Sequence, residues 1–200
     1  HFGHKKLNIV SQSSPTGTQY LQATGAAFAL DRNNENGIVY VSSGEGTTSQ
    51  GDFHEALNWS SRVKAPVIFH IENNGYAISV PIDEQTSGGS VYKISSGYEN
   101  LHRIKIDGTD YFESLIAFNS ACDRARKGLG PTLLELKTYR YHGHFHADQT
   151  EKYRTEDEEN EWKNRDCIKT FEKKVTEQKL MTKAELNKLK KNNFKLTPIK

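Results

Sequence analysis

The sequence predicts an α/β fold with a doubly wound parallel sheet. Short β-rich apolar runs alternate along the chain with longer segments whose apolar residues have helical spacing. Strands that alternate with helices of this length are typical of parallel sheets with crossover helices on both faces. The sequence contains no internal repeat, so we expect one such domain.

The first half of the predicted domain contains two helices and two strands. A polar, turn-rich loop covers residues 1–17, and helical spacing then runs over 18–30. A strand is predicted over 38–42, a helix over 50–62 and a second strand over 67–71. The residues predicted to face inward from the second helix are Phe53, Ala56, Leu57 and Trp59.

The second half begins with residues 75–101, which are rich in Gly and Ser and lack clear periodicity. We expect this segment to be a long functional loop. A third strand is predicted over 103–106, a helix over 111–127 and a fourth strand over 133–139. The apolar positions of that helix are Leu115, Ile116, Phe118, Ala121 and Cys122.

Beyond Glu151 the composition shifts sharply to Lys, Glu and Asn. We therefore expect a domain over residues 1–150 and a charged helical C-terminal extension over residues 151–200. The acidic run Glu156–Glu159 is predicted to be a solvated helix start that the helix dipole favours. The end of the chain, residues 190–200, is predicted to fray.

Within the extension, a weak amphipathic stripe predicts a helix over residues 161–180. Thr182 and Glu185 have the spacing of a capping box at the start of a last short helix. The residues of the stripe are Trp162, Ile168, Phe171 and Val175.

Composition narrows the class of protein. The net charge of +2 is too small to indicate a nucleic-acid or membrane partner. Only 34% of residues are hydrophobic and the mean hydropathy is −0.76, which fits a hydrophilic tail or a part of a larger assembly. No run reaches membrane-spanning length, and the isolated Cys122 and Cys167 favour a reducing, cytoplasmic location. Because the chain begins at His1 without Met, we expect it to be a fragment.

Polar turns follow the first two predicted strands: Gly44-Glu45-Gly46 and Asn73-Asn74-Gly75. Each alone is a common tight turn. Because parallel strands end at the same sheet edge, we expect Glu45 and Asn74, 29 residues apart (74 − 45), to meet there. A carboxylate and a carboxamide oxygen suit Mg²⁺ that holds a diphosphate. Thr47–Gln50 is predicted to open a helix whose N-terminus favours the anion.

A second cluster contains His142, His144 and His146, which would share one face of an extended segment. A transition-metal site is one interpretation, although the segment offers no Cys ligand. A solvated loop is the plainer alternative.

Four segments together resemble a known family. They are S-S-P-T-G-T-Q from residue 13, G-E-G-T-T-S-Q-G-D from residue 44, N-N-G-Y-A-I-S-V-P from residue 73 and T-Y-R-Y-H-G-H from residue 138. In this order, over residues 1–155, they resemble the α subunit of the thiamine diphosphate-dependent decarboxylating component of 2-oxo acid dehydrogenase complexes. The segment N-G-Y-A-I-S-x-P favours the branched-chain, 2-oxoisovalerate type over the pyruvate type. The fold of that family, a doubly wound α/β domain that binds thiamine diphosphate, agrees with the fold predicted above.

The resemblance implies the cofactor ligands. Glu45, the side chain of Asn74 and the backbone carbonyl of Tyr76 would hold Mg²⁺. The residues that would line the diphosphate are Gly44, Gly46 and Thr47.

The segment before the first helix matches further family positions. Ser14 and Thr16 match contacts at the pyrimidine end of the cofactor, although an aliphatic residue often stands where Thr16 does. In some relatives this loop binds a monovalent cation, and K⁺ is the candidate ion here. Helix capping is the alternative. The residues implied for the cation are Ser13, Pro15, Thr18 and Gln19.

His144 matches a family histidine near the thiazolium and the phosphates, so the resemblance implies a catalytic role in orienting substrate or in acyl transfer. Phe145 stands where animal relatives carry a regulatory serine, which excludes phosphorylation there and favours a bacterial-type enzyme. Asp148 matches an acid that helps order the active-site loop. Asp107 and Asp110 are predicted to be loop caps.

The implied activity is oxidative decarboxylation of a 2-oxo acid with acyl transfer to a lipoyl-bearing acyltransferase component. In the family, a β subunit supplies the glutamate that activates the aminopyrimidine, and sequence before His1 supplies a Tyr-Arg element. We therefore expect this α part to need a β subunit or β-like domain, in a heterotetramer or a fused polypeptide. The alternatives are a pyruvate or acetoin dehydrogenase α subunit, and a non-catalytic assembly module of the same fold.

Overall fold

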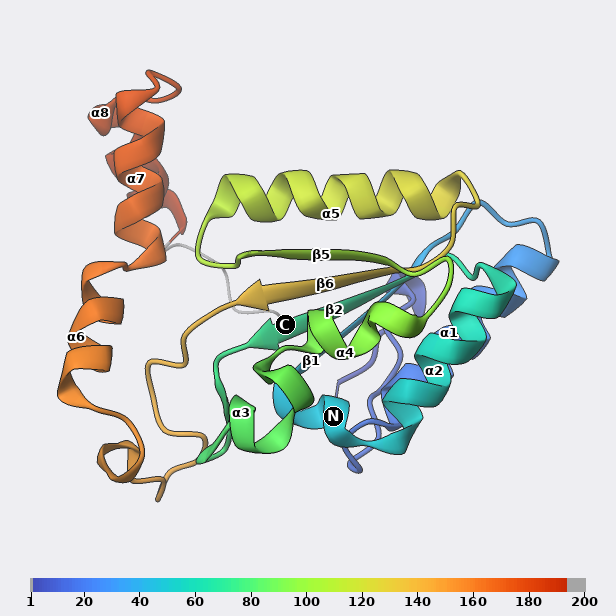
Figure 1. Cartoon of the computed structure of the whole chain (residues 1–200). Helices are drawn as coiled ribbons and strands as arrows, with labels where there is room; N and C mark the ends of the chain where they lie inside the picture. Colours follow the sequence, from blue (N-terminus) through green and yellow to red (C-terminus); the bar gives the residue numbers. More distant parts are fainter. Residues whose placement is uncertain (1, 194–200) are drawn as a thin grey trace.

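A computed structural model describes residues 2–193 of the chain and shows one central parallel sheet (Figure 1). Its strand order is β1-β2-β6-β5, and all three neighbouring pairs are parallel. The doubly wound parallel α/β fold predicted from the sequence is confirmed. The strands are β1 (Val39–Gly44), β2 (Val67–Asn73), β5 (His102–Asp107) and β6 (Thr132–Lys137).

Helices cover both faces of the sheet. On one face α1 (Thr18–Arg32) and α2 (Gly51–Val63) pack together, and on the other lies α5 (Tyr111–Arg126) (Figure 1). Because successive strand residues point to opposite faces, β2 supplies both cores. Phe69 belongs to the cluster under α1 and α2, and its neighbour Ile68 belongs to the cluster under α5.

The long helices and the strands of the central sheet agree with their predicted bounds to within a few residues.

Residues 75–101 do not form the expected long loop. They contain several elements of two to four residues, which are too short to show an apolar period in the sequence. Val91 is fully buried in the core, so the segment packs against the domain. The elements are β3 (Tyr76–Ala77), β4 (Val80–Pro81), α3 (Ile82–Gln85), the 3-10 turn η3 (Ser87–Gly89), α4 (Val91–Ile94) and the 3-10 turn η4 (Ser95–Gly97).

The predicted N-terminal loop also contains structure. A 3-10 turn, η1 (Lys5–Leu7), lies between the bridged residues His4 and Ile9. The remainder of residues 2–17 forms no helix or strand.

The C-terminal helices stand beyond the carboxyl ends of the strands (Figure 1). The single helix predicted over 161–180 is wrong, because Asp166 starts a new helix by accepting hydrogen bonds from the N–H groups of Ile168 and Lys169. The elements are the 3-10 turn η5 (Thr150–Lys152), α6 (Glu156–Asn164), α7 (Cys167–Glu177) and α8 (Lys183–Asn193).

The predicted capping box before α8 is confirmed. The Glu185 carboxylate accepts the Thr182 N–H at 2.8 Å, and the Thr182 hydroxyl accepts the Glu185 N–H at 3.3 Å. Helix α8 is described up to Asn193, and the fraying predicted for residues 190–200 stays a prediction. Residues 194–200 lie outside the described residues.

Four positions predicted to be apolar contacts are instead exposed. Ile116 is 70% exposed, Ile168 is 64% exposed, and Trp59 and Leu115 are each 43% exposed. In α5 the buried stripe has a strict four-residue spacing of small side chains, which places Leu115 and Ile116 on the solvent side. That stripe consists of Ala117, Ala121 and Ala125, with Cys122 beside it.

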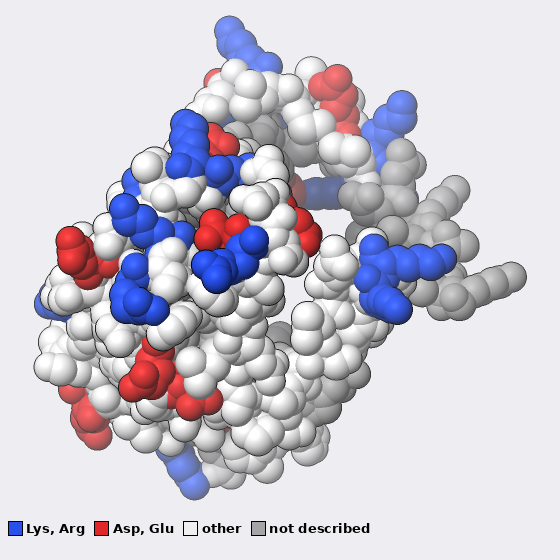
Figure 2. Space-filling view, turned by 90° about the vertical axis from the view of Figure 1, so that its right-hand side faces the viewer, with Lys and Arg blue, Asp and Glu red and all other residues white. Residues whose placement is uncertain are grey.

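Within residues 2–193, no helix is both long and apolar enough to span a bilayer. Figure 2 shows basic and acidic side chains side by side on one face of the molecule. This agrees with the small net charge of +2.

Candidate functional site

The candidate site lies where β1, β2 and β6 end. Gly44 is in register with Glu72, and Asn73 with Lys137, so the three strands end at one edge of the sheet. The helix that follows β1 and the helix that precedes β6 lie on opposite faces. Ligands of open α/β sheets bind at such a change of face, beyond the carboxyl ends of the strands.

Glu45 follows β1 directly and is fully buried. Its Oε2 accepts hydrogen bonds from the Asn74 backbone N–H at 3.0 Å and from Asn74 Nδ2 at 3.4 Å. The structure thus brings together the two side chains that the sequence singled out. The helix predicted to open over Thr47–Gln50 begins at Gly51, with Gln50 as its N-cap, and a 3-10 turn, η2 (Glu45–Ser49), which contains Glu45 itself, precedes it.

Two oxygens of this pair lack a hydrogen-bond donor. Among the described residues, Glu45 Oε1 and Asn74 Oδ1 are buried and have no partner. Leaving two buried acceptors unpaired costs free energy, and an oxygen-seeking cation would satisfy both. The donor set therefore fits Mg²⁺.

Burial raises the pKa of Glu45 above its ordinary value. The Asn74 N–H and the positive charges of Lys137 and Arg140 act in the opposite direction. A divalent cation at Glu45 would add to the stabilisation of the charged form.

Gly46 allows η2 to approach β3 closely. A Cβ at this position would lie 2.9 Å from the Ala77 Cβ and 3.2 Å from the Ala77 Cα. At Gly44 the nearest atom to an added Cβ is the Glu72 carbonyl at 3.8 Å, an ordinary contact. Of these two glycines, only Gly46 is required by packing. The contact of Gly44, Gly46 and Thr47 with the diphosphate stays a prediction.

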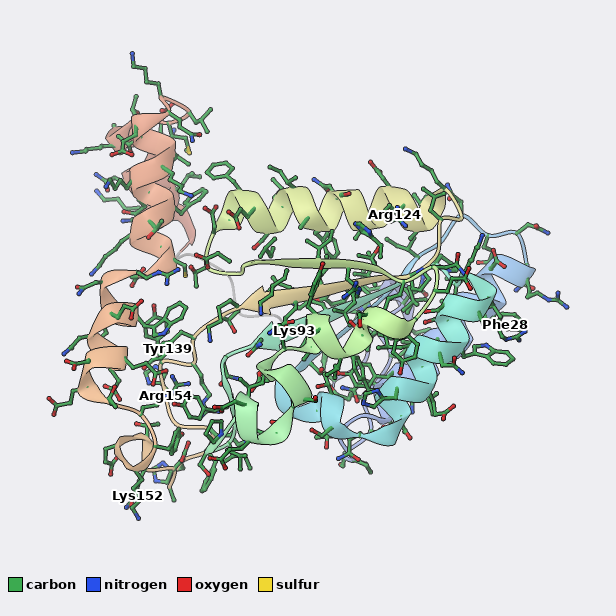
Figure 3. All side chains as sticks on the ribbon, in the orientation of Figure 1. Phe28, Lys93, Arg124, Tyr139, Lys152 and Arg154 are labelled. Atoms are coloured by element: carbon green, nitrogen blue, oxygen red, sulfur yellow. The ribbon has the colours of Figure 1, made fainter. Side chains whose placement is uncertain are left out.

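Arg154, a buried residue that was not predicted from the sequence, forms a hydrogen bond with the turn that contains Asn74. The Arg154 guanidinium lies 4.4 Å above the Tyr76 ring and 4.5 Å from the Tyr139 ring. Its Nη2 donates to the Asn74 carbonyl at 3.3 Å, and its Nη1 pairs with Glu158 at 2.5 Å. Figure 3 shows Tyr139 and Arg154 together between the strand ends and α6.

The acidic run Glu156–Glu159 was predicted to be solvated, and this is wrong for Glu158. Its carboxylate pairs with the buried Arg154 and accepts a hydrogen bond from the Tyr76 hydroxyl at 3.4 Å. The Tyr76 hydroxyl also donates to the Tyr153 carbonyl at 3.2 Å. Metal binding by the Tyr76 carbonyl stays a prediction.

The segment that carries His144 is held by Asp148. Its Oδ2 accepts the His144 N–H and the Tyr153 hydroxyl, each at 2.6 Å. These two hydrogen bonds, that of Tyr153 above all, lower the pKa of Asp148. Arg140 donates to the Tyr153 hydroxyl at 2.7 Å and to the Ile78 carbonyl at 2.8 Å, which connects the segment to the β3–β4 turn.

The three histidines are exposed, and the catalytic role of His144 stays a prediction. Among the described residues, no group of three or more His, Cys, Asp or Glu side chains is arranged to bind a metal. The transition-metal interpretation of His142, His144 and His146 therefore has no structural basis.

Comparison with known proteins adds the family. The family described as "Dehydrogenase E1 component" matches residues 1–196 of the chain. The chain belongs to this family. It is 41% identical over 168 residues to the Staphylococcus aureus "Pyruvate dehydrogenase E1 component subunit alpha", with 84% of this chain and 45% of that protein covered. It is 40% identical over 182 residues to the Bacillus subtilis "2-oxoisovalerate dehydrogenase subunit alpha", with 91% and 55% covered.

The chain spans about half the length of the curated E1 relatives it matches. A third, the Mycobacterium tuberculosis "3-methyl-2-oxobutanoate dehydrogenase subunit alpha", is 39% identical over 168 residues, with 84% and 46% covered. A solved transketolase from Campylobacter jejuni shares the fold, with a TM-score of 0.54 and 22% identity over 63% of this chain and 20% of that chain.

Local hydrogen bonds hold the segment of residues 13–19, at the start of α1. The Ser13 and Thr18 hydroxyls bond to each other, and Thr18 Oγ1 also donates to the Pro15 carbonyl at 3.1 Å. Gln19 Oε1 accepts the Gly17 N–H at 2.9 Å. The N-cap residue of α1 is Gly17, and the Gln19 side chain accepts its N–H, so the capping alternative is supported for Gln19. Cation binding by Ser13, Pro15, Thr18 and Gln19 stays a prediction, as do the cofactor contacts of the exposed Ser14 and Thr16.

Helix α1 is anchored beside the site. The fully buried Tyr20 forms a hydroxyl–hydroxyl hydrogen bond with Ser43, next to the Gly44-Glu45 turn. Burial raises the pKa of Tyr20 to about 12. The smaller predicted loop caps are also present: Asp110 caps α5, and Asp107 accepts from the Thr109 N–H at 2.9 Å.

Proposed function

We propose that the protein to which this chain belongs catalyses thiamine diphosphate- and Mg²⁺-dependent oxidative decarboxylation of a 2-oxo acid, with acyl transfer to a lipoyl group. The observation that carries this proposal is the buried Glu45–Asn74 pair, with two unpaired oxygens at the carboxyl edge of the sheet. Its position in a dehydrogenase E1 chain makes Mg²⁺ and a diphosphate the ligands that fit.

The residues of the chain would bind and orient the cofactor. Glu45, Asn74 and the carbonyl of Tyr76 would hold Mg²⁺, and His144 would orient substrate near the reacting carbon. Bound thiamine diphosphate supplies the nucleophilic carbon and the electron sink for loss of CO₂. The diphosphate and pyrimidine contacts would come from Gly44, Gly46, Thr47, Ser14 and Thr16, with K⁺ at Ser13, Pro15, Thr18 and Gln19.

For the substrate we favour a branched-chain 2-oxo acid. Relatives named for pyruvate and for 2-oxoisovalerate are equally similar to the chain, so the preference rests on the N-G-Y-A-I-S-x-P segment from residue 74. Pyruvate is the second candidate.

We also propose how the chain is used. Residues 1–150 would form the cofactor-binding part and residues 151–200 a charged helical extension. A β subunit would complete the site, a lipoyl-bearing acyltransferase would receive the acyl group, and the complex would work in the cytoplasm.

Calorimetry of thiamine diphosphate binding to the α–β assembly in the presence of Mg²⁺ tests the proposal. We expect binding in the wild type, loss of at least about tenfold in affinity in Glu45→Ala, and no change in Glu72→Ala, the exposed carboxylate at the end of the neighbouring strand. Absence of binding, or binding that Glu45→Ala leaves unchanged, would favour a non-catalytic assembly module. Turnover of pyruvate and of 2-oxoisovalerate by the same assembly then decides between the two substrates.

A further inference from the structure

A second buried carboxylate lies behind the Asn74 turn. Glu135 of β6 is fully buried, and four donors converge on it. Its Oε1 accepts from Asn73 Nδ2 at 2.6 Å and pairs with Lys105 Nζ at 3.4 Å. Its Oε2 accepts from the Ser90 hydroxyl at 2.8 Å and from the Tyr92 N–H at 2.5 Å. Glu135 therefore joins the turn after β2 to α4 and to β5.

Asn73 is held at both ends of its carboxamide. Nδ2 donates to Glu135, and Oδ1 accepts the Gly75 N–H at 3.0 Å. Its backbone carbonyl accepts the Thr138 N–H at 2.9 Å. The carboxamide cannot flip without setting a donor against the Gly75 N–H and an acceptor against the carboxylate. The backbone on both sides of Asn74 is thus fixed by Asn73.

We propose that Glu135 and Asn73 form a positioning pair that presents Asn74 to the metal. This inference rests on the proposed function, because it takes Asn74 as a ligand of Mg²⁺. Neither Glu135 nor Asn73 contacts the metal in this proposal. They hold the turn so that the Asn74 N–H reaches Glu45 at 3.0 Å while Asn74 Oδ1 is left without a protein donor.

The hydrogen-bond pattern defines a substitution and its rescue. In Glu135→Gln the new NH₂ group would face either the Asn73 Nδ2 donor or the Tyr92 N–H donor, whichever way the carboxamide is turned. Asn73→Asp sets two carboxylates at the 2.6 Å separation of the present hydrogen bond. In the double variant Asn73→Asp/Glu135→Gln, the new NH₂ group can donate to the new carboxylate, and the new carbonyl can accept from Ser90 and Tyr92.

The test is a titration of Mn²⁺, followed by electron paramagnetic resonance, into the α–β assembly with thiamine diphosphate present. We expect Glu135→Gln and Asn73→Asp each to weaken Mn²⁺ binding at least about tenfold, and the double variant to return within about threefold of the wild type. At saturating metal and cofactor, kcat should change by no more than about threefold, because the pair acts on binding alone. Glu72→Gln, the same chemical change at an exposed strand end, should bind like the wild type.

Two results would overturn the pairing: single variants that bind Mn²⁺ normally, or a double variant no better than the worse single variant. If the added buried charge prevents Asn73→Asp from assembling, Asn73→Ala removes the carboxamide without adding charge. Unchanged Mn²⁺ affinity in assembled Asn73→Ala would also reject the inference. A wild type that fails to bind Mn²⁺, or Glu45→Ala that binds normally, would instead refute the proposed function.

Discussion

Glu45 combines two properties that usually exclude each other in a protein core: complete burial and an unpaired carboxylate oxygen. An isolated buried carboxylate favours its protonated form, because burial penalises the charge. A metal ligand must be deprotonated. In the proposed role of Glu45 as a metal ligand, its protonation state would therefore depend on whether a cation is bound.

The first prediction concerns the pH dependence of stability without metal. Because the pKa of Glu45 is raised in the folded protein, its contribution to stability is fully present below the ordinary pKa of 4.5 and is lost as pH rises through the folded value. Glu45→Gln, which mimics the protonated acid, should therefore be more stable than the wild type at pH 7–8. Urea unfolding from pH 4.5 to 8 without divalent cations measures this difference, which should shrink as pH falls. A difference that does not vary with pH would contradict the expected ionisation.

At the scale of residues, the sequence predicted the two central residues of the turns, but it did not predict the residues that hold those turns in place. Glu45 and Asn74 were predictable because each directly follows a strand. Asn73, Glu135 and Arg154 were not, because their roles depend on partners 62 and 80 residues away that only the sheet brings together. A buried Glu between apolar β6 residues was the one available signal, since a charged side chain is rarely buried unless it is paired.

At the scale of elements, the site depends on how closely short segments approach one another. The 3-10 turn η2 lies against β3 at Gly46, and Gln85 of α3 donates to the Glu45 carbonyl at 3.0 Å. These contacts join η2, which contains Glu45, to β3 and to α3.

The second prediction compares the two glycines of the Gly44-Glu45-Gly46 turn. Gly46→Ala should lower the free energy of unfolding by about 1–3 kcal/mol, because the new methyl group overlaps Ala77. Gly44→Ala should change it by less than about 1 kcal/mol, since the residue has φ −79° and an added Cβ would lie at an ordinary contact distance of 3.8 Å from the Glu72 carbonyl. Denaturant unfolding without ligands measures both, and equal losses would show that close approach is not what requires Gly46.

The third prediction concerns α7, whose Phe171 ring lies 5.0 Å from the Tyr111 ring and 5.9 Å from the Phe112 ring. Phe171→Ala should cost about 1–2 kcal/mol, less than for a fully buried Phe, because the side chain is half-buried. Ile168→Ala, on the same helix but 64% exposed, should stay within about 0.5 kcal/mol. Thermal unfolding of both variants checks this, and the reverse ranking would mean that α7 packs by another face.

The elements show where apolar periodicity succeeds as a predictor. It located α1, α2 and α5, which are 13 to 16 residues long. It failed over residues 75–101, where each element has too few residues for a period. It also joined α6 and α7, because the Asp166 cap that separates them is a single residue within a continuous polar pattern.

At the scale of the whole molecule, Arg154 connects the C-terminal helices to the strand ends. Its guanidinium lies between two aromatic rings and is bound to α6 through Glu158 and to the turn after β2 through Asn74. Tyr139 continues the stack onto Trp162 of α6, with ring centroids 5.2 Å apart. The position of α6 and that of the turn that carries Asn74 are therefore linked by one side chain.

The fourth prediction tests this link. Arg154→Lys keeps the charge but loses the planar group that stacks on both rings, so we expect a loss of about 2 kcal/mol in stability. Amide hydrogen exchange should become faster in both α6 and residues 74–77. Arg126→Lys, an exposed change at the end of α5, is the control and should alter neither. Faster exchange in α6 alone would show that the turn is held without Arg154.

The order of the strands has a consequence for how the chain is made. Among the described strands of the sheet, β6 is the last to be synthesised, yet it lies between β2 and β5. Before β6 is synthesised, β1 and β2 can already pair, whereas β5 has no neighbour among the described strands of the sheet. Non-local pairing of this kind slows folding. We expect pulse-labelled refolding to protect the amides of β5 and β6 in the same kinetic step, and earlier protection of β5 would show that it first pairs elsewhere.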